Sequence, residues 1–200
     1  MEAPGGRRAA TGVSQSRCDL MSGMGELWRS LEGALPASAH VLGVDFSPEM
    51  ARRARTHWSF GVDVLVQDVL ERTPEESSAD VVVSSFGLKT FDRDQQERLA
   101  HILAKILKPG GVCSFIEISV PRFGPLRVVF LFYLKWVIPV IGRLLLGNPA
   151  SYSMLGVYTE AFCDASYFAS CLRKAGLEAS SVSYFFGCAT GVRAFKWDRV

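Results

Sequence analysis

The sequence lacks the signatures of several protein classes. Its formal net charge is only +2, and it has no run of Lys and Arg interleaved with aromatic residues, so no nucleic-acid partner is expected. Five cysteines are present but none forms a C-x-x-C pair, which argues against a metal site. A secretory signal is absent, and the odd cysteine count favours reduced thiols in a cytoplasm-like compartment. No Ser/His/Asp arrangement is visible, and His40, His57 and His101 are expected at the surface.

The chain has enough apolar residues for one domain with a real core. Hydrophobic residues make up 48% of its 200 positions and charged residues 21%. Residues 1–17 are polar, rich in Gly, Ala and Arg, and without periodicity, so they are predicted to be a disordered tail. An organelle presequence is the weaker alternative, because no amphipathic apolar face is present. A single domain is therefore predicted over residues 18–200.

Strand-like and helix-like patterns alternate along that domain. The expected strands are one that ends near Asp19, followed by 40–46, 62–69, 79–88, 112–120 and a terminal pair over 178–186 and 188–197. The expected helices are 25–35, 47–58, 92–107 and 164–177. Repeated βα units with nearly continuous apolar strands predict an α/β fold: a Rossmann-like doubly wound sheet, mostly parallel with a terminal antiparallel strand. In such sheets, ligands bind at the carboxyl ends of the strands.

The clearest predicted helix covers residues 92–107. Asp92 is its expected N-cap and Gln95 follows three residues later, which is the capping-box spacing. KPGG, residues 108–111, is expected to stop it. The predicted inward stripe is Leu99, Ile102, Leu103, Ile106 and Leu107.

A glycine turn follows the first predicted strand in CDLMSGMGELW, residues 18–28. Gly23 and Gly25 permit a tight turn before a helix N-terminus, where backbone N–H groups bind anions. A dinucleotide motif requires a third glycine where this chain has Trp28, which argues against NAD or FAD. The turn suits a small anion, such as the carboxylate of an amino-acid moiety. A purely structural turn is the alternative.

Acidic residues end the next two predicted strands. Asp45 lies 20 residues after Gly25, the distance at which a carboxylate accepts hydrogen bonds from ribose hydroxyls. It could also cap the following helix, although Ser47 fits that role. Asp68 is placed to accept a hydrogen bond from the exocyclic amine of adenine. Residues that could form apolar walls for a purine, or simply belong to the core, are Phe46, Met50 and Val69. A carboxylate, a ribose and an adenine together describe S-adenosyl-L-methionine.

These residues bring a family resemblance into view. The stretches DLMSGMGE, VDFSPEM, QDV, SSFGLKTF, LKPGG, FIEIS, SYSML, AGLE and ATGV occur in the order typical of class I S-adenosylmethionine-dependent methyltransferases. The chain most resembles the UbiE-type family that C-methylates ubiquinone and menaquinone precursors. The resemblance implies that residues 18–200 are a methyltransferase domain. It also implies cofactor contacts from Asp19, Ser22, Gly23, Gly25, Asp45 and Asp68, with Ser84 and Ser85 beside the methionine portion and the reaction centre.

The chain departs from the family pattern in three places. Met21 stands where the family usually has another glycine. Lys89 and Thr90 replace the usual Arg-Asn after F-G-L, and Lys lacks the planar fork of Arg. Family members also carry N-terminal helices that cover the pocket, whereas a low-complexity stretch precedes the first strand here. A start further upstream, an exposed cofactor site and impaired activity are the three interpretations.

A long apolar segment, residues 126–147, lies within a predicted insertion over 122–160 on the substrate side or facing a membrane. Its length suggests a membrane span. However, Arg127, Lys135 and Arg143 interrupt it, and Pro139 is expected to break its middle. The cations are eight residues apart and should share one side, opposite the apolar mass. A helix at a membrane interface and a cap packed on the core are equal alternatives. The expected location is cytoplasmic, with peripheral contact at the inner face of the membrane under the first alternative.

The leading functional hypothesis is C-methylation of a prenylated benzoquinol or naphthoquinol. Assistance to the hydroquinone is expected from Lys89, Ser85, Glu117 and Tyr152. For Glu117 the alternative is a structural hydrogen-bond acceptor. Methylation of another small hydrophobic acceptor is the second hypothesis, and a non-catalytic methyltransferase-like scaffold is the third. Clustered thiolates for binding arsenic are missing, which disfavours an arsenite methyltransferase.

Overall fold

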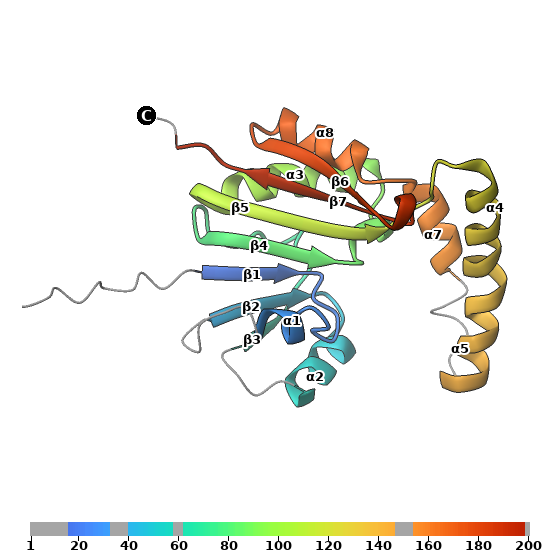
Figure 1. The fold of residues 1–200 in the computed structure, drawn as a ribbon. Coiled ribbons are helices and arrows are strands. Elements are labelled where there is room, and N and C mark those ends of the chain that lie inside the picture. Colours follow the sequence, from blue (N-terminus) through green and yellow to red (C-terminus); the bar gives the residue numbers. More distant parts are fainter. Residues whose placement is uncertain (1–15, 33–39, 58–61, 147–153, 199–200) are drawn as a thin grey trace, which may run out of the picture.

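A seven-stranded sheet forms the centre of the molecule (Figure 1). The computed structural model describes residues 16–32, 40–57, 62–146 and 154–198. Across that part of the chain the strand order is β3-β2-β1-β4-β5-β7-β6. The strands are β1 (Ser16–Leu20), β2 (His40–Asp45), β3 (Val62–Val66), β4 (Ala79–Ser85), β5 (Leu107–Ile118), β6 (Glu178–Tyr184) and β7 (Ala189–Phe195).

One strand of this sheet runs against the others. β7 pairs antiparallel with both β5 and β6, while the pairings from β3 through β5 are parallel. The predicted Rossmann-like, mostly parallel sheet is confirmed. The antiparallel strand is the last in the chain, yet it lies between β5 and β6 rather than at the edge. β1 lies between β2 and β4, so the strand order reverses there and a crevice is expected at the carboxyl ends of β1 and β4.

Helices cover both faces of the sheet. The larger core cluster joins β1, β4, β5 and β7 to α3 (Arg93–Ile106) and α8 (Ser166–Lys174). A smaller cluster joins Trp28 of α1 (Trp28–Glu32), Val41 of β2 and Ala54 of α2 (Pro48–His57). Along β2, Val41 belongs to the smaller cluster and Val44 to the larger one. This alternation is what a doubly wound sheet requires.

The predicted capping of α3 is confirmed. The Asp92 carboxylate accepts from the Gln95 N–H, and the Gln95 side chain accepts in return from the Asp92 N–H. The inner stripe from Leu99 to Ile106 is buried. The helix ends at Ile106, and KPGG does not form a separate stop. It lies within β5 as an irregular stretch, because Ala79 pairs with Leu107 while Val81 pairs with Val112.

Several other boundaries also differ from the prediction. β1 begins at Ser16, so the predicted tail 1–17 ended two residues too late, and residues 1–15 lie outside the described part. α1 begins at Trp28 because residues 21–27 form the glycine turn. Pro139 does not break its helix. A π-helical turn, η2 (Tyr133–Val137), precedes it, and this wider turn relieves the clash that a proline ring makes in an α-helix.

The described residues of the predicted insertion 122–160, which are 122–146 and 154–160, form a lobe at one end of the sheet (Figure 1). It contains α4 (Gly124–Phe132), η2, α5 (Ile138–Leu146) and α7 (Leu155–Phe162). α7 packs against η2 and also against η1 (Leu88–Thr90), the 3₁₀ turn that follows β4. Because β4 ends beside β1, this contact places the lobe next to the carboxyl ends of these two strands.

Candidate functional site

The glycine turn after β1 is held by its own backbone. The Gly25 N–H donates to the Ser22 carbonyl at 2.9 Å, and the Trp28 N–H donates to the Gly25 carbonyl at 3.0 Å. Gly25 has a φ of +82°, and a Cβ there would lie 2.4 Å from the Trp28 ring. Glycine is therefore required at this position both by conformation and by space.

Trp28 fills the space beneath the turn. Its indole is fully buried, and its Nε1–H donates to Asp19 Oδ2 at 2.7 Å. A Cβ on Gly43 of β2 would lie 2.5 Å from the same ring. The predicted role of Trp28 was only to exclude a pyrophosphate, and its contact with Asp19 was not predicted. Gly43 in the middle of HVLGVDF was the available signal, since a glycine within a strand marks a close approach.

Asp19 is a buried carboxyl group with one oxygen in use. Burial raises its pKa from 3.8 to about 7, the Trp28 hydrogen bond lowers it in part, and the negative charges of Glu26 and Asp45 raise it further. Its Oδ1 atom has no hydrogen-bond partner among the described residues. An unsatisfied buried acceptor is costly, which makes this atom a candidate ligand contact.

Asp45 joins the ends of three strands. Its Oδ2 accepts from the Gly23 N–H at 2.8 Å, and its Oδ1 accepts from the Ser47 N–H at 2.9 Å. Its carbonyl accepts from the Gln67 N–H at 2.9 Å. The structure therefore brings together the glycine turn, the end of β2 and the segment after β3, where Asp68 follows.

The residues expected around a purine lie in different environments. Phe46 and Met50 are exposed near the end of β2 and on α2. Asp68 is exposed, and its Oδ1 accepts from the Leu70 N–H at 2.8 Å. Val69 is buried in the main core, so its side chain packs with the fold rather than beside the exposed Phe46.

Two serines at the carboxyl ends of β1 and β4 have buried hydroxyl groups with no hydrogen-bond partner in the part of the chain that the structure describes. The Oγ atoms of Ser22, in the turn after β1, and Ser84, at the end of β4, join Asp19 Oδ1 in this respect. β1 and β4 are adjacent, with Asp19 paired to Val83, so the three atoms belong to neighbouring strand ends. The other two such atoms of the described residues lie on α3 and α7.

Asp19 and Ser22 lie on the Trp28 side of the sheet, since a Cβ on Gly43, which pairs with Asp19, would lie 3.1 Å from Ser22 Oγ. Ser84 pairs with Phe115 of the main core and so faces the other side. The Asp19 and Ser22 oxygens fit the polar groups of an amino-acid moiety.

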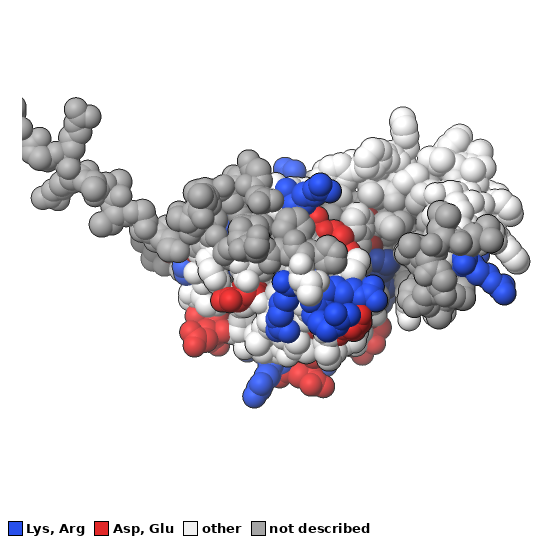
Figure 2. Space-filling model, turned by 90° about the horizontal axis from the view of Figure 1, so that it is seen from below, with Lys and Arg blue, Asp and Glu red and all other residues white. Residues whose placement is uncertain are grey.

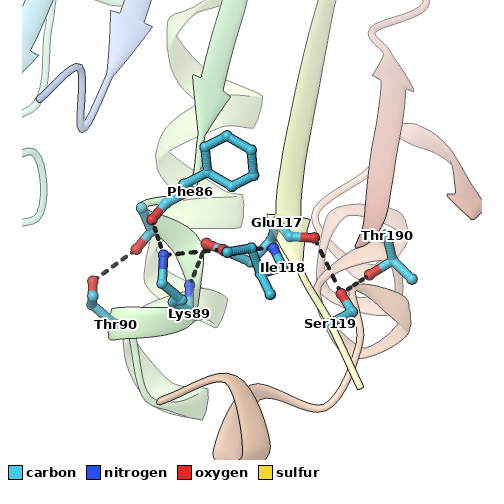
Figure 3. A network of polar contacts seen from close by, with 8 residues as sticks. Phe86, Lys89, Thr90, Glu117, Ile118, Ser119 and Thr190 are labelled. Atoms are coloured by element: carbon cyan, nitrogen blue, oxygen red, sulfur yellow. Dashed lines mark hydrogen bonds and ion pairs between the residues drawn. The ribbon is translucent and has the colours of Figure 1, made fainter. Parts of the chain in front are cut away.

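Lys89 and Glu117 form a buried ion pair beside this edge (Figure 3). The Lys89 ammonium lies 3.1 Å from Glu117 Oε1 and also donates to the Phe86 carbonyl. Glu117 accepts from the backbone N–H groups of Lys89 at 2.9 Å and Ile118 at 2.8 Å. Burial raises the pKa of Glu117, and the Lys89 charge opposes that shift. With these donors, Glu117 acts as a structural acceptor that fixes the loop between β4 and η1.

The structure gives less information about the remaining predicted site residues. Ser85 is half-buried at the end of β4, and Tyr152 lies outside the described residues. Met21 adopts a φ of +55° where the family usually has glycine, and its side chain packs against Gly87. No group of three or more His, Cys, Asp or Glu side chains that could hold a metal occurs in residues 16–32, 40–57, 62–146 and 154–198.

Comparison with known proteins gives the family. Residues 6–198 match the model of the ubiE/COQ5 methyltransferase family. Demethylmenaquinone methyltransferase of Thermus thermophilus is 31% identical over 174 residues, which cover 86% of this chain and 78% of that protein. The enzyme of the same name from Chlorobaculum tepidum is 32% identical over 162 residues, covering 80% of this chain and 64% of that protein.

Solved structures show the same fold. Human N-acetylserotonin methyltransferase in complex with S-adenosylmethionine has a TM-score of 0.63 at 22% identity, over 92% of this chain and 48% of that one. An S-adenosylmethionine-dependent methyltransferase from Mesorhizobium loti has a TM-score of 0.60 at 16% identity, over 92% of this chain and 91% of that one.

The strand order and the family match together define the class: this is an S-adenosylmethionine-dependent methyltransferase with a Rossmann-like fold. The chain belongs to the ubiE/COQ5 methyltransferase family. S-Adenosylmethionine is its cofactor, and the buried oxygens of Asp19 and Ser22 that have no partner among the described residues fit the cofactor's amino-acid end.

Proposed function

We propose that this methyltransferase transfers a methyl group to a ring carbon of a prenylated benzoquinol or naphthoquinol, a step of ubiquinone or menaquinone biosynthesis. The observation that carries the proposal is the position of the apolar lobe. Its helix α7 packs on η1, which follows the end of β4 where Ser84 and Ser85 lie. A long hydrocarbon tail requires apolar surface beside the reacting ring. The Thermus and Chlorobaculum relatives are named demethylmenaquinone methyltransferases, which agrees with this choice.

The proposed cofactor contacts follow the three strand ends. When bound, S-adenosylmethionine supplies an activated methyl group on a sulfonium centre, so the protein has mainly to position the reactants. Asp45 would accept the ribose hydroxyls, and Asp68 with Phe46 and Met50 would surround the adenine. Val69 is left out of this contact because its side chain is buried in the main core. The residues proposed to hold the amino-acid end are Asp19, Ser22, Gly23 and Gly25.

The proposed contacts of the substrate come from the β4 end. A hydroquinone attacks through carbon more readily once a hydroxyl proton has left, so a polar group near that oxygen helps. Ser85 and Lys89 are the proposed groups. Glu117 already accepts three hydrogen bonds, so its part is to position Lys89 rather than to take a proton.

The test is a transfer assay with the full chain, S-adenosylmethionine and a chemically reduced, short-chain demethylmenaquinol. We expect a product heavier by one methylene, with the new methyl group on a ring carbon, and S-adenosylhomocysteine in equal amount. Ser85→Ala should lower the rate, while Ser180→Ala on the exposed side of β6 should not. Cofactor binding without transfer to either quinol class would contradict the proposed substrate and favour another hydrophobic acceptor.

A further inference from the structure

The apolar lobe carries a continuous helix with two opposite apolar faces. α4, η2 and α5 follow one another without a break from Gly124 to Leu146. Its inner face is buried or half-buried and consists of Leu126, Phe130, Leu134, Ile138 and Gly142. Its outer face is 57–69% exposed and consists of Val128, Phe132, Trp136 and Val140. The two sets are offset by two residues, about 200° around a helix, so they lie on opposite sides.

The π-helical turn keeps the outer face straight. Residues four apart advance about 40° beyond one turn of an α-helix, so a stripe with this spacing would spiral away. In η2 the Ile138 N–H donates to the Tyr133 carbonyl, which makes this turn wider than an α-turn. In a wider turn each residue advances by a smaller angle, so residues four apart fall short of a full turn and the stripe rotates back. Val128, Phe132, Trp136 and Val140 therefore remain on one side.

The sequence that forms most of the lobe carries charges of one sign, and two of its four cations pair with acids that follow it: Lys135 with Glu160 and Arg122 with Asp164. Between Glu117 and Glu160 the sequence has no Asp or Glu but contains Arg122, Arg127, Lys135 and Arg143. Lys135, one of the three cations predicted to share a side of this helix, is half-buried and neutralised by Glu160 on α7. Arg127 and Arg143 are exposed. Figure 2 shows the lobe as largely uncharged surface next to a body that carries clusters of both signs.

A hairpin tip adds two more exposed aromatic side chains. Phe185 and Phe186, in η3 (Phe185–Gly187), are 77% and 92% exposed and have φ values of +49° and +57°. A left-handed conformation is unfavourable for such residues, so this turn holds two phenylalanines in solvent at a cost to the fold. The tip lies beside the start of α4, because Phe186 and Phe123 line one cavity of about 310 Å³.

We propose that this chain docks on the surface of an anionic lipid bilayer through the outer face of α4–α5 and the Phe185–Phe186 tip. An apolar face with Trp and Phe, on a helix that carries exposed Arg127 and Arg143 and no Asp or Glu, matches the boundary between acyl chains and anionic headgroups. The proposal does not depend on which quinol is methylated. It explains why the outer face is apolar and exposed, since methylation of a soluble small substrate would not require such a face.

A helix lying in the interface fits the structure better than a membrane span. Gly124–Arg143 is the one helix among the described residues that is long and apolar enough to cross a membrane. Its inner face, however, is packed on α7, and the Lys135–Glu160 ion pair joins the two helices. A span would have to place this pair, or Lys135 alone, within the hydrocarbon region.

The test is flotation of the full chain with phosphatidylcholine vesicles, with and without phosphatidylglycerol. We expect flotation with the anionic vesicles, less of it at high salt, and release by alkaline carbonate. The double change Phe132→Ser, Trp136→Ser should weaken binding at least about tenfold, because two large side chains lose their burial in the acyl region. Trp197→Ser is the matched control, since Trp197 is 63% exposed and Trp136 67%.

A second variant separates docking from folding. Phe186→Gly relieves the positive φ, so we expect its urea midpoint to rise while its flotation falls. Several outcomes would overturn the proposal: no flotation of the wild type, equal flotation of the double variant, or retention after carbonate. A dimer that the double variant abolishes, without vesicle binding, would assign the face to a second copy instead. Quinol methylation without flotation would overturn the docking proposal but leave the proposed substrate. Flotation without methylation would overturn the proposed substrate but leave the docking proposal.

Discussion

At the scale of single residues, the Trp28–Asp19 contact shows how the turn after β1 is stabilised without a third glycine. Gly25 and Gly43 leave room on two sides of one indole, and the indole in turn holds a buried carboxyl group. The residue that a sequence pattern marks as a departure is therefore part of the site's framework.

Trp28→Phe should destabilise the fold by about 1–3 kcal/mol, because Asp19 Oδ2 would lose its donor while remaining buried. The measurement is the free energy of unfolding in urea. Trp197→Phe removes a similar hydrogen bond, to Glu178, at an exposed site and should cost much less. Equal losses in the two variants would mean that the buried contact has no special value.

The stability should also depend on pH through Asp19. Its folded-state pKa of about 7 lies above the ordinary value of 3.8, so the native chain binds more protons than the unfolded chain between these limits. The contribution of Asp19 to stability is therefore fully present below about pH 4 and is lost as the pH rises through 7. Asp19→Asn should flatten the pH dependence of unfolding over this window. Parallel curves for the two proteins would show that Asp19 titrates normally.

At the scale of elements, the Lys89–Glu117 pair ties η1 to β5 and so fixes the loop that follows β4. Lys89→Met should cost about 3–5 kcal/mol, because it leaves a buried carboxylate without its cation. Adding Glu117→Gln should recover most of that loss. Lys105→Met on exposed α3 surface is the control in the same urea measurement. A double variant no more stable than Lys89→Met would contradict the pairing.

Elements set by neighbouring residues were predictable, and those set by distant contacts were not. α3 followed from the Asp92 and Gln95 capping box and an apolar stripe, all within 15 residues. In contrast, Lys89 and Glu117 are 28 residues apart, and nothing local shows that their strand and turn meet. The π turn before Pro139 contacts α7, which follows later in the chain, and no local pattern marks it, so the sequence alone predicted a break there.

At the scale of the whole molecule, the repeated βα units predicted a parallel sheet, and the strand ends gathered the expected residues at one edge. The place of β7 between β5 and β6 was not predictable from periodicity, because a terminal strand pair shows the same pattern in either order. The hydrogen bond from the Gly23 N–H to Asp45 directly joins two of the residues predicted to form the site.

The most direct measurement is isothermal titration of the full chain with S-adenosylmethionine, comparing wild type, Asp45→Asn and Asp63→Asn. Asp45→Asn keeps the shape of the side chain but removes the charge that ribose hydroxyls would meet, while Asp63 is an exposed residue paired with His40 on the β2 and β3 strands. We predict that Asp45→Asn weakens binding at least about tenfold, roughly 1.4 kcal/mol, and that Asp63→Asn leaves it unchanged. Equal affinity of wild type and a folded Asp45→Asn protein would contradict a cofactor site at these strand ends.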